Sequence, residues 1–548
     1  MPAYSVADSV DYAKEISADD SKVVKEIVCR VVDIPEGTRK MVEVRGRQIL
    51  IVNDNGKFYA FNGMCPHYGY SMEYGVYSNG KIRCPVHGGC FNVKTGDIED
   101  YPTFDSIHPF EVLQDKGDLI IKTTVNRLAT DKRTRKSWIK QTSRKIPIIV
   151  VGGGISAQSF VENLRQSGCS SPIVILSQEA VPPYDRVLVS KFIFPDIGAL
   201  RSPEWYKEYK VDLRCNSKVV KLEADAHIVT LENGTLMRYC KLVIATGAKV
   251  RTLRGADRDL KGVYTLRNVG DMRTVAAEAE AKDVVCIGGS FIGMEAAAGL
   301  SARSSKVSVI CSTQEPLPAF GEDIGKAFHK KWESAGIDIH TRESVEYLEG
   351  DEEGRVKEVV LRSGKRIRAE VVVAGIGVEP DTDWLRSEGI DLDGRGFIKV
   401  NEKFETSGKD VFAIGDVVSA PLPFWGYESI NIQHFQTAQR HGQLAALALA
   451  GKQHDGKLIP FFWMYALGVI ARLAGCTQDY DDTLTRGELD EFDWTKYYFK
   501  NGIVVAVSTA GNRQTVAQFQ FLCEQGVRIT NEDVLRNLNN DDWSHLLK

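Results

Sequence analysis

The chain has 548 residues, of which 43% are hydrophobic and 26% are charged, and its formal net charge is −4. One hydrophobic core cannot organise a chain of this length, so we expect several globular domains. The small net charge argues against general binding to nucleic acid or to membrane surfaces. No apolar run reaches the roughly 18 residues that a membrane span requires.

Two further features concern the compartment. The eleven cysteines show no paired framework spacing, which favours a reducing environment over secretion. Residues 1–20 are acidic, without the apolar core of a signal peptide or the Arg-rich composition of a transit peptide. The cytoplasm is therefore the predicted compartment.

Residues 22–125 are predicted to form a small all-β domain, because short alternating apolar runs are separated by Gly, Asn and Asp turns. Two of its loops carry Cys65-Pro-His67 and Cys84-Pro-Val-His87. Two thiolates can hold one iron and two imidazoles the other, which is the ligand set of a Rieske [2Fe–2S] centre. A structural zinc site is the alternative, but zinc sites usually show C-x2–4-C spacing.

The same segment resembles the Rieske ferredoxin family through C-P-H…C-P-x-H-G-x-x-F, in which Phe91 closes the match. In high-potential Rieske proteins each loop adds a cysteine, and the two form a disulfide. Here Tyr70 and Val86 stand at those positions, so the resemblance implies the lower-potential, ferredoxin-like class. Cys90, three residues after His87, is a rival ligand that we expect to be a packed neighbour instead.

Residues 126–145 are predicted to be an interdomain linker, since they hold eight Lys or Arg against one Asp. A nuclear-import patch or a patch for an acidic partner is the alternative interpretation.

A dinucleotide-binding domain is predicted to begin at residue 146, and its first part spans 146–265. A β-branched run leads into Gly152, Gly154 and Ala157, and an apolar-periodic helix follows from Ser159. The first glycine permits a tight turn, and the second lets the backbone approach a pyrophosphate. The helix N-terminus offers free N–H groups to the phosphates. An ordinary Gly-rich turn is the alternative.

The next predicted strand ends near Glu179, the candidate acceptor for the adenine-ribose hydroxyls, although a shifted register would put Gln178 there. The following sequence, PPYDRVLVSK, resembles the signature of flavin-dependent reductases of the ferredoxin and rubredoxin type. That resemblance implies that Arg186 contacts FAD and that Lys191 lies beside the flavin ring.

Two later elements resemble the pieces that complete the FAD site in that family. The first contains Thr246, Gly247 and Arg251. The second contains Asp416, in a predicted second part of the FAD domain at 386–455, where its carboxylate would accept from the ribityl chain. The four elements occur in the family's order, which makes chance a poor explanation.

A nicotinamide domain is predicted at 266–385 between the two FAD parts. Gly288 and Gly293 fit a second G-x-G-x-x-G turn, in which Ser290 replaces the middle glycine and could weaken binding through its side chain. The second strand of this domain ends at Cys311 without a Glu for NADH or a nearby Arg for NADPH, so the choice of nucleotide stays open.

The resemblance also implies residues around the nicotinamide. Phe291 and Glu295 would shield and orient it, with Glu295 paired to Lys191, and Gly377 belongs to a loop on the nicotinamide side. The alternative is that Glu295 merely packs or caps its helix.

A C-terminal α+β interface domain is predicted at 456–548. The resemblance implies that His434 and Phe435 lie at the flavin edge and that Trp463 belongs to another element near the flavin. His441 shares a helix face with His434, but no carboxylate accompanies them, so we expect no metal there.

Taken as a whole, the chain resembles the Rieske-bearing members of the apoptosis-inducing-factor family. We therefore expect an N-terminal all-β Rieske domain, two Rossmann-like α/β domains of the glutathione-reductase type and a C-terminal α+β domain. No paired cysteines follow the first flavin motif, which excludes a disulfide relay. The family resemblance allows a mitochondrial association and a link to cell death.

The predicted activity is electron transfer from NADH or NADPH through FAD to the chain's own [2Fe–2S] cluster, and then to an unknown acceptor protein or small molecule. Two alternatives stay open: a redox-sensing signalling or assembly protein with little turnover, and the reductase component of an oxygenase system. The sequence also leaves a homodimer open.

Overall fold

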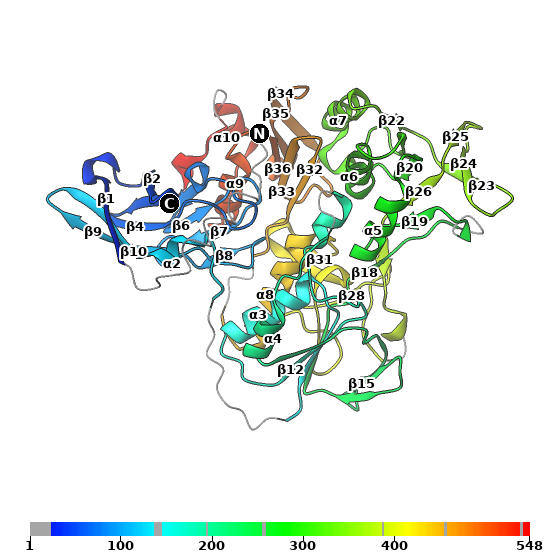
Figure 1. Ribbon diagram of the computed structural model, residues 1–548, viewed down its shortest axis with the longest axis horizontal. Helices are drawn as coiled ribbons and strands as arrows, with labels where there is room; N and C mark the ends of the chain where they lie inside the picture. Colours follow the sequence, from blue (N-terminus) through cyan, green and yellow to red (C-terminus); the bar gives the residue numbers. More distant parts are fainter. Residues whose placement is uncertain are drawn as a thin grey trace. The chain divides into compact units, whose positions relative to one another are not determined.

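The computed structural model divides into two compact units, drawn in Figure 1. The first unit combines residues 1–136 with 499–507 and 512–548, and the second contains 137–498 and 508–511. The residues that the structure describes are 23–135, 145–192, 196–254, 259–385, 388–453, 457–537 and 541–547. Residues 1–22 and 136–144, on which the predictions of compartment and linker partly depend, lie outside this description.

The first unit contains a six-stranded antiparallel sheet in the order β1-β10-β9-β4-β3-β2. Its strands are β1 (Val23–Arg30), β2 (Arg39–Val44), β3 (Arg47–Asp54), β4 (Lys57–Asn62), β9 (Pro109–Asp115) and β10 (Asp118–Thr124), followed by the short helix α2 (Val125–Leu128). Asn55-Gly56 makes the β3–β4 turn with both residues at positive φ, the conformation that matches the twist of two-residue hairpins. The buried faces of β3 and β10 supply much of its apolar core.

A second, four-stranded sheet of the first unit carries the predicted cluster loop of Cys84 and His87, whereas the loop of Cys65 and His67 follows β4. Its order is β5-β6-β7-β8, with β5 (Val76–Ser78), β6 (Lys81–Arg83), β7 (Cys90–Asn92) and β8 (Ile98–Asp100). Helix α9 (Thr515–Glu524) packs against this sheet through Ala517 and Phe521, which share an apolar cluster with Val76 and Cys90. Helix α10 (Asn531–Arg536) follows.

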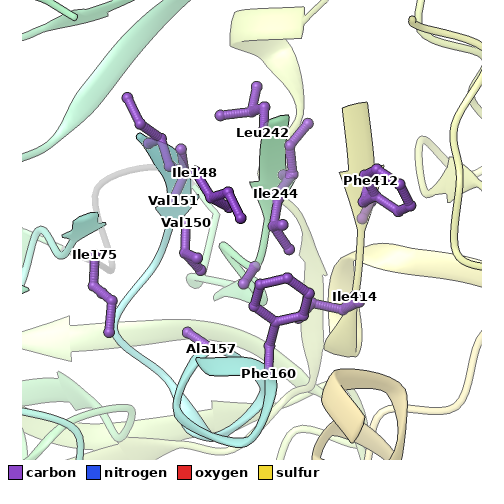
Figure 2. Packing of buried hydrophobic residues seen from close by; sticks show 14 of the residues in the cluster. Ile148, Val150, Val151, Ala157, Phe160, Ile175, Leu242, Ile244, Phe412 and Ile414 are labelled. Carbon is purple, nitrogen blue, oxygen red and sulfur yellow. The ribbon is translucent and has the colours of Figure 1, made fainter. Parts of the chain in front are cut away.

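The second unit contains two parallel sheets. The first has the order β13-β12-β11-β17-β29. Its strands are β11 (Ile148–Val151), β12 (Ile173–Leu176), β13 (Val211–Arg214), β17 (Lys241–Ile244) and β29 (Val411–Ala413). All four residues of β11 are buried, as expected for a central parallel strand covered on both faces. Figure 2 shows β11 and β17 side chains packed with Phe160 and Ile414.

Two helices far apart in the sequence pack together beside this sheet, which itself joins β11, β12, β13 and β17 to the much later strand β29. Helix α3 (Ile155–Gln166) packs against α8 (Phe435–Leu449). An added Cβ at Gly442 would lie 2.4 Å from the carbonyl oxygen of Ser156, so only glycine permits this approach. The hydroxyl of Ser159 donates a 2.7 Å hydrogen bond to the carbonyl oxygen of Gln439.

The other parallel sheet has the order β19-β26-β20-β21-β22. It consists of β19 (Val263–Thr265), β20 (Asp283–Ile287), β21 (Lys306–Ile310), β22 (Ile337–His340) and β26 (Val371–Ala374), with helices α5 (Val269–Glu278), α6 (Phe291–Leu300) and α7 (Glu322–Ser334). Strand β19 precedes residue 266, where sequence placed the start of this domain. Trp332 is fully buried, and its indole N–H donates to the carbonyl oxygen of Met294 at 3.1 Å, which fixes α7 to α6.

The remaining elements are one short helix and several further sheets. They comprise α4 (Pro203–Glu208), β14–β16 (Val219–Glu223, Ile228–Leu231, Leu236–Arg238), β18 and β27 (Ala248–Val250, Val378–Pro380), β23–β25 (Val345–Gly350, Val356–Leu361, Arg366–Arg368), β28, β30 and β31 (Ile398–Lys399, Val418–Leu422, Tyr427–Ile430), and β32–β36 (Phe461–Ala466, Val469–Gly475, Asp482–Glu488, Asp493–Lys500, Ile503–Ala510). Among the described residues, no helix is both long and apolar enough to cross a membrane.

The core in Figure 2 gives a prediction about stability. Phe160 is fully buried, so Phe160→Ala should lower the free energy of unfolding by about 3–5 kcal/mol through lost burial and a residual cavity. Leu236→Ala is the control, because Leu236 is 64% exposed and its loss should change that free energy by less than about 0.5 kcal/mol. Urea unfolding followed by circular dichroism measures both, and equal effects would contradict the core assignment.

Candidate functional site

The first predicted phosphate turn forms an open cradle at the N-terminus of α3. Gly152 has φ +118°, and an added Cβ would lie 2.2 Å from the carbonyl oxygen of Ala245. Gly154 caps α3, and an added Cβ there would meet no atom within 4 Å. Ala157 is fully buried beneath the turn. Free N–H groups therefore face open space, which fits the pyrophosphate of a dinucleotide.

Buried polar groups without partners point to the same ligand. The hydroxyl of Thr246 and one carboxylate oxygen of Asp416 are buried, and neither has a hydrogen-bond partner in the part of the chain described. Burial raises the pKa of Asp416, although the positive charges of Arg267 and Arg186 oppose this effect. Buried polar atoms almost always find a partner, so these residues fit the predicted FAD. Gly247 follows at φ +72°.

Two residues that sequence assigned to different parts of FAD lie together. The Arg186 guanidinium donates to a Glu179 carboxylate oxygen, and the Tyr184 hydroxyl donates to the other at 2.8 Å. Arg186 also donates to the carbonyl oxygen of Arg267 at 2.6 Å. Tyr184 and Arg267 were not among the predicted site residues; Tyr184 belongs to the PPYDR motif, whereas no motif marks Arg267.

A buried ion pair joins the two parallel-sheet domains of the second unit. The Lys191 Nζ lies 2.6 Å from Glu295 Oε1, and both residues are 5% exposed. The Ser190 hydroxyl donates to Glu295 Oε2 at 2.5 Å, a contact that sequence reasoning did not find. The ammonium also lies 4.9 Å from the centre of the Trp463 ring, within cation–π range.

A glycine on α6 allows the Lys191–Glu295 pair to form. Glu295 lies on α6, and Lys191 follows the short helix η3 (Arg186–Ser190). An added Cβ at Gly299 would lie 2.5 Å from the carbonyl oxygen of Lys191, so this glycine lets α6 approach the Lys191 backbone.

His434 is a neutral imidazole at the start of α8. Burial and, to a lesser extent, the charge of Lys191 lower its pKa to about 3. Its ring lies 4.5 Å from that of Phe462 on β32, next to Trp463, and its Nδ1 accepts from the backbone N–H of Gln436 at 3.4 Å. Phe435, the first residue of α8, is partly buried.

The second phosphate turn repeats the geometry of the first. Gly288 has φ +122°, and an added Cβ would lie 2.3 Å from the Gly375 carbonyl oxygen. At Gly293 an added Cβ would lie 1.8 Å from the Gly288 carbonyl oxygen. Ser290 caps α6 with φ −90° and ψ −174°, matching Gly154 at −90° and −172°. Because this is extended backbone, serine adopts it without strain.

The neighbouring loop contains Gly377, one of the three residues predicted for the nicotinamide side. Strands β18 and β27 pair, and the Arg251 N–H donates to the carbonyl oxygen of Gly377 at 3.0 Å. Gly377 has φ +93° and open space around its missing Cβ. Phe291 is partly buried, with its ring 5.7 Å from that of Phe320. Arg251 therefore lies beside the nicotinamide-side loop as well as in its own motif.

The residues that follow β21 are hydrogen-bonded to an arginine that lies far from them in the sequence. Cys311 Sγ lies 2.9 Å from the hydroxyl oxygen of Thr313 and packs against Gly289. The backbone N–H of Arg342 donates to the carbonyl oxygen of Thr313 at 2.9 Å, and Arg342 is exposed. This arginine lies in the turn that follows the neighbouring strand β22.

The four predicted cluster ligands form two like pairs. The Cys65 thiol is hydrogen-bonded to that of Cys84, which raises the Cys65 pKa together with burial. His67 Nδ1 lies 3.1 Å from His87 Nδ1. Both loops contain the same turn. In each, the backbone N–H of the residue four positions after the cysteine donates a hydrogen bond to the cysteine carbonyl oxygen.

This pairing matches the two-ligand sets that the irons of a binuclear cluster need. Among the described residues, no three His, Cys, Asp or Glu side chains are arranged around one metal position. A Rieske cluster needs only two protein ligands on each iron, with two thiolates on one and two imidazoles on the other. Cys90 lies on β7 in the apolar cluster with Phe521.

Three family models match the chain. They are pyridine nucleotide-disulphide oxidoreductase at residues 146–442, Rieske [2Fe-2S] domain at 25–111 and reductase C-terminal at 461–539. The matches confirm the predicted fold class and the predicted FAD, NAD(P)H and [2Fe–2S] cofactors.

Individual relatives agree with these models. The chain is 35% identical to apoptosis-inducing factor 3 of Homo sapiens, over 93% of this chain and 86% of that protein. It is 27% identical to the rubredoxin-NAD(+) reductase of Ectopseudomonas oleovorans, over 66% of this chain and 95% of that one. The crystal structure of Fdr9 superposes with a TM-score of 0.64 at 29% identity and covers 71% of this chain and 97% of Fdr9. The chain therefore belongs to the pyridine nucleotide-disulphide oxidoreductase family, among the apoptosis-inducing factor 3-like proteins that carry a Rieske domain.

Proposed function

We propose that this oxidoreductase uses the residues of the two dinucleotide turns and the two cluster loops to move electrons from NAD(P)H through FAD to its [2Fe–2S] centre and on to an acceptor. When bound, FAD accepts a hydride and the cluster accepts single electrons, so together they convert a two-electron donor into a one-electron supply. The observation that carries the proposal is the buried Lys191–Glu295 pair, which links the two dinucleotide domains.

The chain's own residues bind FAD from three sides in this proposal. The N–H groups at Gly152 to Gly154 and the positive end of α3 hold the diphosphate. Thr246 and Asp416 supply their unpartnered oxygens to the sugar chain. Glu179 and Arg186 act as one hydrogen-bonded unit at the adenosine side, because their side chains are paired.

Lys191 provides a fixed positive charge beside the flavin ring. Glu295 and Ser190 fix its position from α6 and η3, and Trp463 covers it from β32. A charge held in a water-poor site stabilises developing negative charge without the cost of reorganising solvent. His434, neutral because of its lowered pKa, contributes shape and hydrogen bonding rather than charge.

The second dinucleotide binds at the N-terminus of α6. Gly288, Ser290 and Gly293 hold its diphosphate, and Ser290 fits because its backbone conformation equals that of Gly154. Phe291 and Gly377 lie on the nicotinamide side, with Glu295 one turn further along the helix from Phe291.

Cys65 and Cys84 are the proposed ligands of one iron, and His67 and His87 those of the other. We place the protein in a reducing compartment such as the cytoplasm, which fits eleven cysteines that form no disulfide within the described chain. Relatives named as ferredoxin reductases support a one-electron carrier protein as the acceptor. Light scattering of the purified chain would decide between a monomer and the homodimer left open by sequence.

Gly152→Ala tests the FAD turn. The added Cβ would strike the Ala245 carbonyl oxygen, so we expect the purified variant to retain about a tenth or less of the FAD of the unaltered protein. Gly168→Ala is a matched control, since Gly168 also has positive φ but open space around its missing Cβ. Absorbance at the flavin band measures both, and full FAD in the first variant would remove this turn from the site.

Glu295→Gln tests the nicotinamide side. Loss of the carboxylate charge leaves Lys191 unneutralised, and we expect flavin reduction by NADH to slow by about tenfold or more. Anaerobic stopped-flow absorbance measures this rate. Glu278→Gln, which breaks the ion pair of Glu278 at the end of α5 with Lys282, should react at the normal rate. An unchanged rate and unchanged NADH affinity in Glu295→Gln would refute the assignment.

A cysteine comparison tests the cluster ligands. Cys84→Ala should abolish the Rieske EPR signal of the reduced protein, because one iron loses a thiolate. Cys90→Ala should retain that signal, since Cys90 packs on β7 in an apolar cluster. Retention of the signal in the first variant, or its loss in the second, would mean that the ligand set is wrong.

A further inference from the structure

Both cluster loops of the first unit are fastened to the C-terminal segment that contains α9. At the first loop, the Tyr70 hydroxyl donates to Asn512 Oδ1 at 2.8 Å. Close by, the side-chain amide of Gln514 donates to the carbonyl oxygen of Tyr74 at 2.8 Å. These bonds join the loop of Cys65 and His67 to the residues that lead into α9.

The second loop is held by a buried arginine. Arg83 is fully buried, and its guanidinium donates to the carbonyl oxygen of Gly88 at 2.7 Å and to Asp100 at 3.0 Å. The same group donates to the Glu524 carboxylate at the end of α9 and lies 4.8 Å from the centre of the Phe521 ring. Gly88 directly follows His87, so one side chain connects a predicted ligand loop to α9.

The chemistry of arginine suits this position. A planar guanidinium presents several donors in fixed directions and can serve a carbonyl group and two carboxylates at once, which a lysine ammonium cannot do with the same geometry. A buried charge is costly unless it is paired, and here Asp100 and Glu524 both pair with it. Glu524 therefore supports Arg83 directly and Gly88 through it.

A second side chain of α9 faces the same loop. Gln520 is 2% exposed, and its side-chain oxygen is buried with no hydrogen-bond partner among the described residues. An added Cβ at Gly88 would lie 3.0 Å from that oxygen. Ala517, Gln520, Phe521 and Glu524 are spaced three and four apart, so one face of the helix makes all these contacts.

We infer that α9 and the residues before it position both cluster loops, so that Arg83, Gln520 and Glu524 are positioning residues for the [2Fe–2S] centre. The inference rests on the proposed ligands Cys65, His67, Cys84 and His87. Groups that hold and orient metal ligands change the properties of the metal without contacting it, so these side chains influence the reduction potential of the cluster.

The test uses Glu524→Gln and Asn512→Ala in the full-length protein loaded with its cofactors. Glu524→Gln removes one negative charge next to Arg83, so we expect the equilibrium for cluster reduction to shift by about tenfold toward the reduced form. Asn512→Ala removes the bond to Tyr70 at an exposed position, so the protein should fold, and the Rieske EPR g values should change.

Glu532→Gln is the matched control. It removes the same charge from an ion pair with Arg536 on α10, where both side chains are 76% exposed, so neither the potential nor the EPR signal should change. The rate of flavin reduction by NADH depends on residues of the second unit, so it should be normal in all three variants. Redox titration followed by EPR supplies the two cluster measurements.

The outcomes separate this inference from the proposed function. A shifted potential in Glu524→Gln or altered g values in Asn512→Ala, with Glu532→Gln unchanged, support the positioning role. Wild-type potential and g values in both variants would overturn it. Absence of any Rieske signal from the unaltered protein, by contrast, would mean that the proposed ligand set itself fails.

Discussion

The second unit depends on one buried ion pair. Lys191 belongs to the segment that follows the first dinucleotide turn, and Glu295 belongs to helix α6, which follows the second dinucleotide turn. Their charged atoms nevertheless lie 2.6 Å apart. Burying two charges costs several kcal/mol unless geometry and hydrogen bonds compensate, and the Ser190 hydroxyl supplies one such bond. Each dinucleotide domain therefore contributes half of a single electrostatic unit, and loss of either half leaves an unpaired charge in the interior.

Local patterns explain why much of the fold was predictable. Both parallel sheets begin with apolar strands that run into glycine turns, and the backbone contacts at Gly152 and Gly288 show why other residues are excluded there. The Cys and His spacing predicted the two loops in which Cys65 pairs with Cys84 and His67 with His87. These features lie within short stretches of chain, where residue type and spacing carry the information.

Contacts between distant segments were not predictable in the same way. Arg83 and Glu524 are separated by 441 positions, and neither belongs to a motif, so only the folded chain reveals their pairing. The carbonyl oxygen of Arg267 meets Arg186 from 81 positions away, and the Arg342 N–H meets Thr313 from the turn after a neighbouring strand. Ser290 fits the second dinucleotide turn because its backbone is extended rather than left-handed. The residue type alone does not specify that conformation.

The return of the C-terminal segment to the first unit has a consequence for biosynthesis. Residues that lie against Gly88 are translated more than four hundred positions after it, and chains grow at about 5–20 residues per second. The N-terminal sheets therefore emerge from the ribosome well before α9 exists. During that interval the apolar surface of Val76 and Cys90 lacks its cover. Completion of the iron–sulfur unit is thus a late event, which couples the synthesis of α9 to a finished redox centre.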